Sequence, residues 1–210
     1  AFVGSLNAFR SYGVKLVGVP MDDDGMKPDR LEEALKANPT TKFIYTIPNF
    51  QNPMGVTIPF EKRKKIYELA CKYDFLIYED DPYGELRYTG EPVPSFKSID
   101  TEGRVVYAGS FSKILCSGIR LGFICASNEM IAKMTALKGN LDSGSPVSSS
   151  LIARYFMEEG KLAAEHELGI YEKTVANNPD ISAEDKEYIL EQLKANFTGE
   201  CSEVGMYLCM

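Results

Sequence analysis

Lys113 lies between two serines in the segment GSFSKILCSGIRLGF, residues 109–123, directly after the apolar run RVVYA. A primary amine is a nucleophile toward aldehydes and, once deprotonated, a general base. Two other polar clusters also follow apolar, β-rich runs, namely NFQNPMG at 49–55 and EDDPYGELRY at 79–88. Together the three clusters supply an amine, carboxylates, an amide, a phenol and hydroxyls.

Each cluster taken alone has a simpler interpretation. A lysine after a strand most often extends to solvent, NFQNPMG has the composition of a turn, and EDDP is a common capping or turn sequence. Their coincidence favours a site, because the carboxyl ends of parallel strands meet at one edge of a sheet and ligands of open α/β sheets bind there. Three adjacent carboxylates would also repel one another unless a cation or a protonated ring shared the site.

The elements that must position these clusters alternate along the chain. Short apolar runs predict strands, and apolar residues at three- and four-residue spacings predict helices between them. The predicted strands are 14–20, 42–48, 75–80, 104–111 and 120–127, and the predicted helices between them are 30–38 and 60–73. Only eight residues separate the last two strands, too few for a parallel crossover, so the last strand is predicted to run antiparallel.

We therefore predict an α/β fold in three layers, a mostly parallel sheet with helices on both faces. In this prediction residues 1–165 form the large domain, in which the helical pattern begins at 128. Residues 166–210 form a helical linker and the start of a smaller C-terminal α/β domain.

Composition excludes several classes of function. The net charge is -7 and the longest basic block is KRKK at 62–65, which argues against a nucleic-acid-binding surface in this segment. Five scattered cysteines without C-x-x-C indicate neither a disulfide framework nor a zinc site, and the single histidine, His166, excludes a multi-histidine metal site. MDDDGM at 21–26 predicts a plain turn. We expect no metal, no membrane span, and a location in the reducing cytoplasm.

The donor set of the three clusters suits pyridoxal 5'-phosphate. The aldehyde of this cofactor requires a lysine amine for a Schiff base, its ring nitrogen requires a carboxylate to remain protonated, and its phenolic oxygen requires neutral donors. Its phosphate requires hydroxyls together with an arginine or a helix N-terminus.

The segments PNFQNPMG, YEDDPYGELRY and GSFSKILCSGIRLGF, in this order and spacing, closely resemble the class I/II aminotransferases of fold type I. The resemblance is strongest to the branch of the kynurenine/2-aminoadipate and the aromatic and branched-chain enzymes, and it extends over residues 1–165. It implies the large domain of a pyridoxal-phosphate-dependent homodimer that moves an amino group from an amino acid to a 2-oxo acid.

The resemblance also implies a role for each matched residue. Lys113 forms the Schiff base and, when released, carries the proton between the substrate Cα and the cofactor. Asp80 pairs with the pyridinium nitrogen, so that electrons of the breaking Cα–H bond drain into the ring. Tyr83 and Asn52 donate to the phenolic oxygen of the cofactor.

The phosphate-binding residues implied in the same way are Ser110 and Arg120, with Ser112 as a helper. Phe2 falls near an aromatic residue that lies against the ring or the substrate in the family. A core aromatic at the entry of a helix is an equally good interpretation of Phe2.

Two alternatives remain open at this stage. Winged-helix transcriptional regulators fuse a DNA-binding domain to an aminotransferase-like effector domain, and the second and third segments resemble that group too, although it usually has a His-Gln-Phe-Pro type sequence where this chain has NFQNPMG. A lyase reaction would use the same cofactor residues.

The family's N-terminal phosphate-binding loop and C-terminal substrate arginine are not recognisable in these 210 residues. We therefore expect the isolated chain to bind cofactor weakly and to turn over little.

Overall fold

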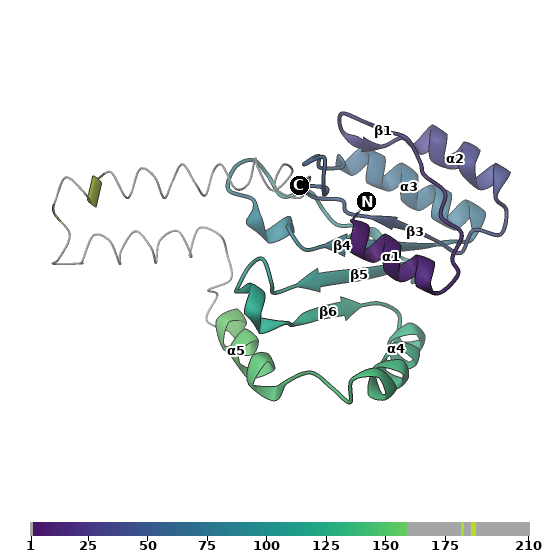
Figure 1. Cartoon of the computed structure of the whole chain (residues 1–210). Coiled ribbons are helices and arrows are strands. Elements are labelled where there is room, and N and C mark those ends of the chain that lie inside the picture. The colour runs from purple at the N-terminus through teal and green to yellow at the C-terminus, as the bar shows by residue number, and fades with distance from the viewer. Residues whose placement is uncertain (1, 159–181, 183–185, 188–210) are drawn as a thin grey trace.

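The computed structural model describes residues 2–158, 182 and 186–187 (Figure 1). Its main sheet has four strands in the order β3–β4–β5–β6, with β3, β4 and β5 parallel and β6 antiparallel to β5. The strands are β3 Phe43–Thr46, β4 Leu76–Asp81, β5 Val105–Ser110 and β6 Gly122–Cys125. The mostly parallel sheet and its antiparallel last strand are thus confirmed.

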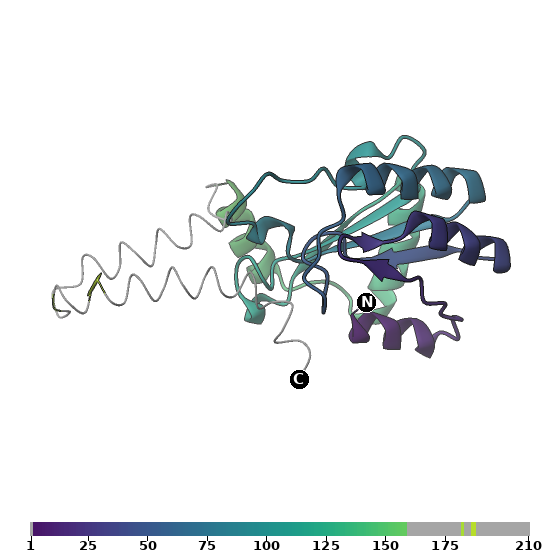
Figure 2. The same cartoon turned by 90° about the horizontal axis from the view of Figure 1, so that it is seen from above.

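Helices cover both faces of this sheet, as predicted (Figures 1 and 2). They are α1 Val3–Ser11, α2 Pro28–Ala37, α3 Phe60–Tyr73, α4 Asn128–Leu141 and α5 Val147–Glu158, with short 3-10 turns η1 Gly84–Leu86, η2 Lys97–Ile99 and η3 Ser117–Ile119. Side chains alternate along a strand. Ile44 and Ile77 therefore pack with α2 and α3, whereas Tyr45 and Tyr78 lie on the α1 side with Phe9.

The main core lies between the sheet and the helices α2 and α3. Its buried members are Leu31, Leu35, Ile44, Ile66, Tyr67, Ala70, Phe75, Ile77, Phe96 and Val105. The spacing of Ile66 and Ala70, four residues apart on α3, puts both on the face that meets the sheet. A smaller buried cluster, Phe111, Ile114, Ile119 and Ala153, lies around the turn after β5.

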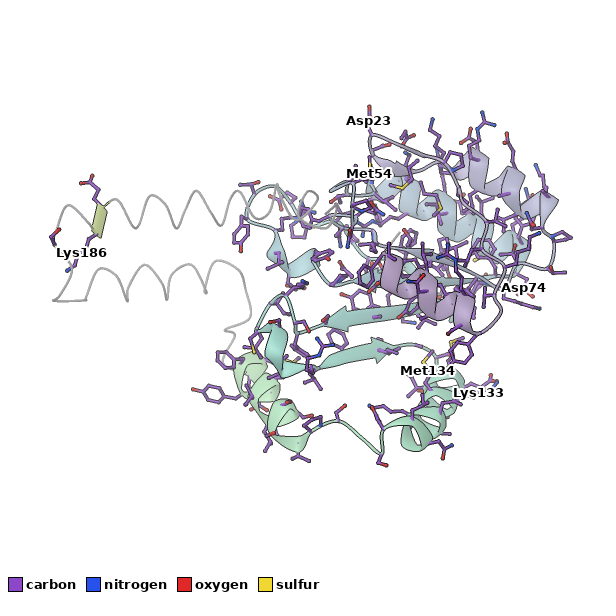
Figure 3. The ribbon with its side chains drawn as sticks, in the orientation of Figure 1. Asp23, Met54, Asp74, Lys133, Met134 and Lys186 are labelled. Atoms are coloured by element: carbon purple, nitrogen blue, oxygen red, sulfur yellow. The ribbon has the colours of Figure 1, made fainter. Side chains whose placement is uncertain are left out.

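The predicted strand at 14–20 is wrong. This segment has no strand assignment in the structure, and the chain forms instead a hairpin of β1 Met21–Asp22 and β2 Gly25–Met26, with Asp23 projecting at its tip (Figure 3). Residues 14–19 and β3 line the same cavity. A strand requires a hydrogen-bonding neighbour, and the apolar pattern alone does not supply one. The turn predicted at 21–26 is present as this hairpin.

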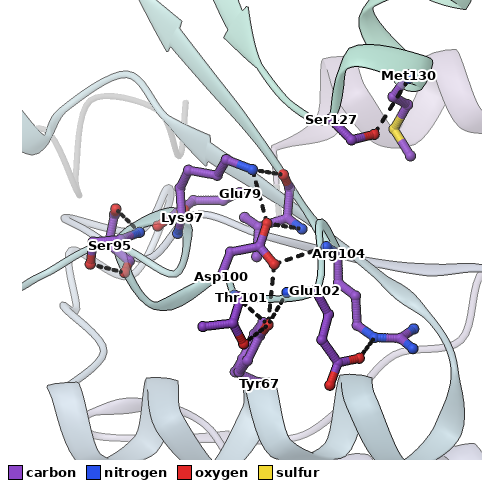
Figure 4. Close-up of polar contacts among 12 residues, drawn as sticks. Tyr67, Glu79, Ser95, Lys97, Asp100, Thr101, Glu102, Arg104, Ser127 and Met130 are labelled. Atoms are coloured by element: carbon purple, nitrogen blue, oxygen red, sulfur yellow. Dashed lines mark hydrogen bonds and ion pairs between the residues drawn. The ribbon is translucent and has the colours of Figure 1, made fainter.

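A polar network holds the segment before β5 in place (Figure 4). The Asp100 carboxylate accepts from the backbone N–H groups of Arg104 and Val105 and from Lys97 Nζ, at 2.9, 3.0 and 2.9 Å. The Tyr67 hydroxyl donates to Asp100 Oδ1 at 3.2 Å. These contacts tie the start of β5 to α3, and they hold the pKa of Asp100 below its usual value against the opposing effect of burial.

The C-terminal predictions lie largely outside the described residues. The boundary expected between 165 and 166, and the small domain that should follow it, are not among them. Residues 186 and 187 are helical, and the Lys186 N–H donates to the Ser182 carbonyl at 2.9 Å. Within the described part of the chain, no helix has both the length and the apolar character needed to cross a membrane.

Candidate active site

The three polar clusters meet at one edge of the sheet because β3, β4 and β5 are parallel. The register pairs Thr46 with Glu79 and Asp81 with Gly109, so the ends of these strands lie side by side. The antiparallel β6 begins at the same edge, where Gly122 pairs with Ser110. The segment that contains Arg120 is thereby brought beside the end of β5.

Asp80, near the end of β4, carries the carboxylate of the site. The Tyr45 hydroxyl of the neighbouring strand donates to Asp80 Oδ2 at 2.5 Å. Burial raises the pKa of Asp80, and the Tyr45 hydrogen bond opposes that rise. A half-buried carboxylate of this kind is suited to share a proton with a cationic ring.

Asn52 and Tyr83 form a buried pair from two different loops. Their relative exposures are 4% and 5%, and a side-chain hydrogen bond joins them. Burial raises the pKa of the Tyr83 phenol, with a smaller opposing effect from Asn52, so the phenol is neutral near pH 7. Asn52 is held in turn by Gln51, whose Nε2 donates to the Asn52 carbonyl at 2.7 Å. The pair offers neutral donors, as the phenolic oxygen of the cofactor requires.

The turn after β5 carries the amine and the hydroxyls. The Ser112 N–H donates to Ser110 Oγ at 3.2 Å, and the Phe111 N–H donates to the Leu121 carbonyl at 3.1 Å. This second bond holds the turn against the start of β6. Lys113, in the middle of the turn, is exposed.

Arg120 is also exposed, with a left-handed backbone at φ 49°, and its Nη1 donates to the Ser117 carbonyl at 3.5 Å. Among the described residues, neither Arg120 nor Lys113 forms a hydrogen bond or ion pair with Asp80, Asn52 or Tyr83. The structure therefore gathers all seven predicted residues at one sheet edge but joins only some of them. The contacts present are within the Asn52–Tyr83 and Ser110–Ser112 pairs.

Phe2 does not belong to the core. It is the N-cap residue of α1, it is 44% exposed, and its ring lies over Gly4, where a Cβ would meet it at 2.6 Å. Of the two interpretations of Phe2, the core aromatic is thus not what the structure shows.

A buried arginine behind the site was missed by the sequence analysis. Arg63 of α3 has 0% exposure, and its Nη2 donates to Asn49 Oδ1 at 2.6 Å. Asn49 Nδ2 donates to Asp81 Oδ2 at 2.9 Å, and Asp81 Oδ1 accepts from the Gly84 N–H at 3.0 Å. This chain of contacts links the loop of Asn52 to the turn of Tyr83. Nothing in the basic block KRKK singles out this arginine, and its spacing of three residues from the buried Ile66 on the same helix is the one signal of burial in the sequence.

A cavity of about 750 Å³ lies beside β3, and two of its lining residues, Tyr45 and Gln51, are hydrogen-bonded to Asp80 and Asn52. Most of its lining comes from α1, the segment 14–19, α2 and β3, and the lining includes no carboxylate. It contains none of the seven residues predicted from the sequence.

Comparison with known proteins identifies the family. The sequence profile described as "Aminotransferase class I and II" matches residues 2–209. The chain belongs to this family. It is 47% identical over 165 residues to aromatic-amino-acid aminotransferase 1 of Thermococcus litoralis, which covers 77% of this chain and 40% of the relative. It is also 34% identical over 160 residues to the uncharacterized HTH-type transcriptional regulator YisV of Bacillus subtilis, covering 76% of this chain and 33% of the relative.

Solved structures agree with this assignment. The kynurenine aminotransferase of Pyrococcus horikoshii, in complex with PMP and with kynurenine as substrate, superposes with a TM-score of 0.75 at 43% identity, over 77% of this chain and 41% of that one. The chain therefore spans well under half the length of the relatives that it matches. The resemblance drawn from the three motifs is confirmed, and the large-domain α/β fold with it.

The family depends on pyridoxal phosphate, and the residues present here fit that group. The fit rests on the donor set: an exposed amine at Lys113, a carboxylate at Asp80 whose Oδ1 has no hydrogen-bond partner in the described part of the chain, and a neutral amide–phenol pair. Ser110, Ser112 and Arg120 lie between the end of β5 and the start of β6, and hydroxyls and a guanidinium are groups that bind a phosphate.

Proposed function

We propose that this chain forms part of a pyridoxal-phosphate-dependent aminotransferase that moves an amino group from an amino acid to a 2-oxo acid. The observation that carries the proposal is the convergence of Asp80, the Asn52–Tyr83 pair and the turn of Lys113 at the carboxyl edge of three parallel strands. This edge is where open α/β sheets bind ligands.

The bound cofactor supplies a cationic ring that accepts the electrons of the bond broken at the substrate Cα. Asp80 would hold the ring nitrogen in its protonated state. The Asn52 amide and the Tyr83 phenol would donate to the phenolic oxygen. Lys113 Nζ would anchor the cofactor covalently and, when the substrate amine displaces it, remove the proton from Cα as a general base.

The phosphate would be held at the turn between β5 and β6. Ser110 and Arg120 supply a hydroxyl and a guanidinium there, and Ser112 contributes a second hydroxyl. Exposure of Arg120 is compatible with this role because its side chain has only one hydrogen bond, to a backbone carbonyl, in the described region.

A second candidate has a specific observation in its favour. The similarity to a helix-turn-helix regulator covers 76% of this chain, so the same fold could serve as the effector domain of a transcriptional regulator. A lyase reaction on the same residues is a further alternative. The two enzyme reactions differ in product, since only amino transfer converts an added 2-oxo acid to an amino acid.

We further propose a cytoplasmic homodimer. Apolar residues exposed on α4 and α5 support the dimer, because such side chains mark interaction surfaces when they lie close together; they are Leu137, Leu141, Leu151, Ile152 and Tyr155. The three cysteines of the described region, Cys71, Cys116 and Cys125, are free thiols, which suits a reducing compartment.

Cofactor attachment provides the first test. The full-length protein that contains this chain is incubated with pyridoxal phosphate, treated with borohydride and digested, and the labelled peptide is identified by mass spectrometry. We expect the label on Lys113 and none in the Lys113→Ala variant. Label on another lysine, or equal label in Lys113→Ala, would falsify the assignment of Lys113. Lys133→Ala is the matched control, since Lys133 lies outside the three motifs, on α4, which has no buried residue, and pairs there with Glu129.

Amino transfer is tested on the same preparation. The substrate panel comprises aromatic amino acids, kynurenine and 2-aminoadipate, each with a 2-oxo acid acceptor. Production of the amino acid that corresponds to the acceptor supports transfer, whereas ammonia release without it supports a lyase. Cofactor uptake without any turnover by the full-length protein would favour the regulator.

A further inference from the structure

A tyrosine that belongs to none of the three motifs lies against the carboxylate of the site. The Tyr45 hydroxyl donates to Asp80 Oδ2 at 2.5 Å, and within the described residues this is the hydrogen bond that holds the Asp80 side chain. We propose that Tyr45 is a positioning residue for Asp80. Its hydroxyl occupies Asp80 Oδ2 and leaves Oδ1 available to the ring nitrogen of the cofactor. The inference rests on the proposed function and adds a residue to it.

The contact follows from the register of two parallel strands. Tyr45 of β3 pairs with Tyr78 of β4, and Asp80 lies two residues further along β4 on the same face. A diagonal neighbour on an adjacent strand is within reach of an aromatic side chain. The phenol of Tyr45 therefore spans from its own strand to the carboxylate at the end of the next.

The Tyr45 ring is fixed on several sides. It lies 5.5 Å from the Phe9 ring of α1 in an edge-to-face arrangement and 5.6 Å from the Tyr78 ring, as centroid distances. The Ser5 hydroxyl of α1 also hydrogen-bonds with the Tyr45 hydroxyl. Since the phenol donates its proton to Asp80, it can accept from Ser5. A ring clamped in this way fixes the carboxylate that it contacts.

The hydrogen bond also sets how strongly Asp80 binds a proton. In the described part of the chain, the Asp80 charge also acts on Tyr78, on the same strand, and on Tyr83, in the following turn. Burial raises the pKa of both phenols, so each is neutral near pH 7. The Tyr45 donor stabilises the carboxylate form of Asp80 and makes it a weaker base. A proton shared between Asp80 and the ring nitrogen then remains on the nitrogen, where it is needed for electron withdrawal.

The substitution Tyr45→Phe removes the hydroxyl and keeps the ring. Tyr78→Phe is the matched control, because Tyr78 lies in the same aromatic cluster and its hydroxyl has no hydrogen-bond partner among the residues described. Both variants and the wild type are loaded with ¹⁵N-labelled pyridoxal phosphate. The ¹⁵N chemical shift of the ring nitrogen, the cofactor dissociation constant and kcat are then measured on each holoprotein.

We expect the ring nitrogen signal of Tyr45→Phe to move toward the unprotonated position while that of Tyr78→Phe stays at the wild-type value. The dissociation constant should rise about 3- to 10-fold in Tyr45→Phe, the effect of one lost hydrogen bond, and kcat should fall more than KM changes. If the wild type binds cofactor at Lys113 but Tyr45→Phe leaves the ¹⁵N shift and the cofactor affinity unchanged, the inference about Tyr45 is overturned and the proposed function is not. A wild type that takes up no cofactor would contradict the proposed function and the inference together.

Discussion

Helices α3 and α4 have equal lengths of 14 residues but depend on different interactions. α3 begins after Pro59 with no side-chain cap, and it is held by the side chains that it buries, Arg63, Ile66, Tyr67 and Ala70. Its apolar members belong to the main core beneath the sheet. Tertiary packing thus stabilises α3, and its own N-terminus contributes little.

α4 has the opposite character. It has no buried residue, and the Lys133 side chain is directed away from the sheet (Figure 3). Ser127 caps the helix by accepting from the Met130 N–H at 3.4 Å, and Lys133 pairs with Glu129 at 2.7 Å. Such local interactions contribute about 0.5–2 kcal/mol for a cap and a few tenths for an exposed pair. α3 is therefore stabilised by buried packing and α4 by local interactions.

The largest effect is expected when the buried guanidinium of α3 is removed. Arg63→Met removes the donor to Asn49 Oδ1 and to the carbonyls of Ile58, Val93, Pro94 and Pro48, of which Pro48 retains the Ile58 N–H. Buried acceptors without partners, and a broken buried network, cost about 3–5 kcal/mol. Denaturant unfolding should report this loss, whereas Arg154→Met on the exposed face of α5 should change the free energy of unfolding by less than about 0.5 kcal/mol. Equal effects at the two arginines would remove the distinction between the regions.

A core truncation sharpens the same comparison. Ile66→Ala on α3 removes a side chain with 0% exposure and should cost about 2–5 kcal/mol. Leu137→Ala on α4, which is 63% exposed, should cost less than about 0.5 kcal/mol in the monomer. Unfolding curves at several protein concentrations distinguish the proposed dimer from a monomer. If the loss of unfolding free energy caused by Leu137→Ala grows with protein concentration, a second copy covers α4.

The free energy of unfolding should depend on pH through Glu79. This β4 carboxylate has 0% exposure, and burial raises its pKa to about 7 although it accepts from the Phe96 and Lys97 N–H groups. Because the folded state holds this proton more tightly than the unfolded state, whose reference pKa is 4.5, stability should fall as pH rises from about 4.5 to about 7 and then level off. The total decline attributable to Glu79 is about 3 kcal/mol.

Glu79→Gln should flatten that decline in a pH series of denaturant unfolding curves. Asp80 and Asp81, whose pKa values are also raised by burial, remain in both proteins, so the difference between the two series isolates Glu79. Glu129→Gln on α4 serves as the exposed control and should leave the slope of the wild type between pH 5 and pH 7 nearly unchanged. Parallel curves for Glu79→Gln and the wild type would contradict the prediction.

The smallest effect is expected at the cap of α4. Ser127→Ala removes the acceptor of the Met130 N–H and should cost about 0.5–1 kcal/mol, the low end of the range for caps because the bond is long. Hydrogen exchange at the first turn of α4 should increase while exchange in α3 stays unchanged. Slower or unaltered exchange in α4 would mean that packing, rather than local signals, holds this helix.

Much of the fold could be predicted because its signals are local. The segment 60–73 has apolar residues at helical spacing, and the structure has α3 at those residues. The eight-residue connection before 120 requires an antiparallel strand, and β6 is antiparallel. The segment 14–20 has the apolar pattern of a strand without a strand neighbour, so the pattern was insufficient there.

The amino-acid sequence by itself determined which polar groups follow which strands, and hence that Asp80, Tyr83 and Lys113 come to one edge of a parallel sheet. It also determined the family, through three motifs in fixed order. Tertiary structure alone decided that Tyr45 reaches Asp80 and that Arg63 is buried beneath the loops of the site. The physical reason is that each contact joins two residues on separate elements: Tyr45 and Asp80 are 35 residues apart along the chain, and Arg63 and Asn49 are 14 residues apart. Such contacts depend on strand register and on how a helix packs against the sheet, and no local sequence pattern encodes either.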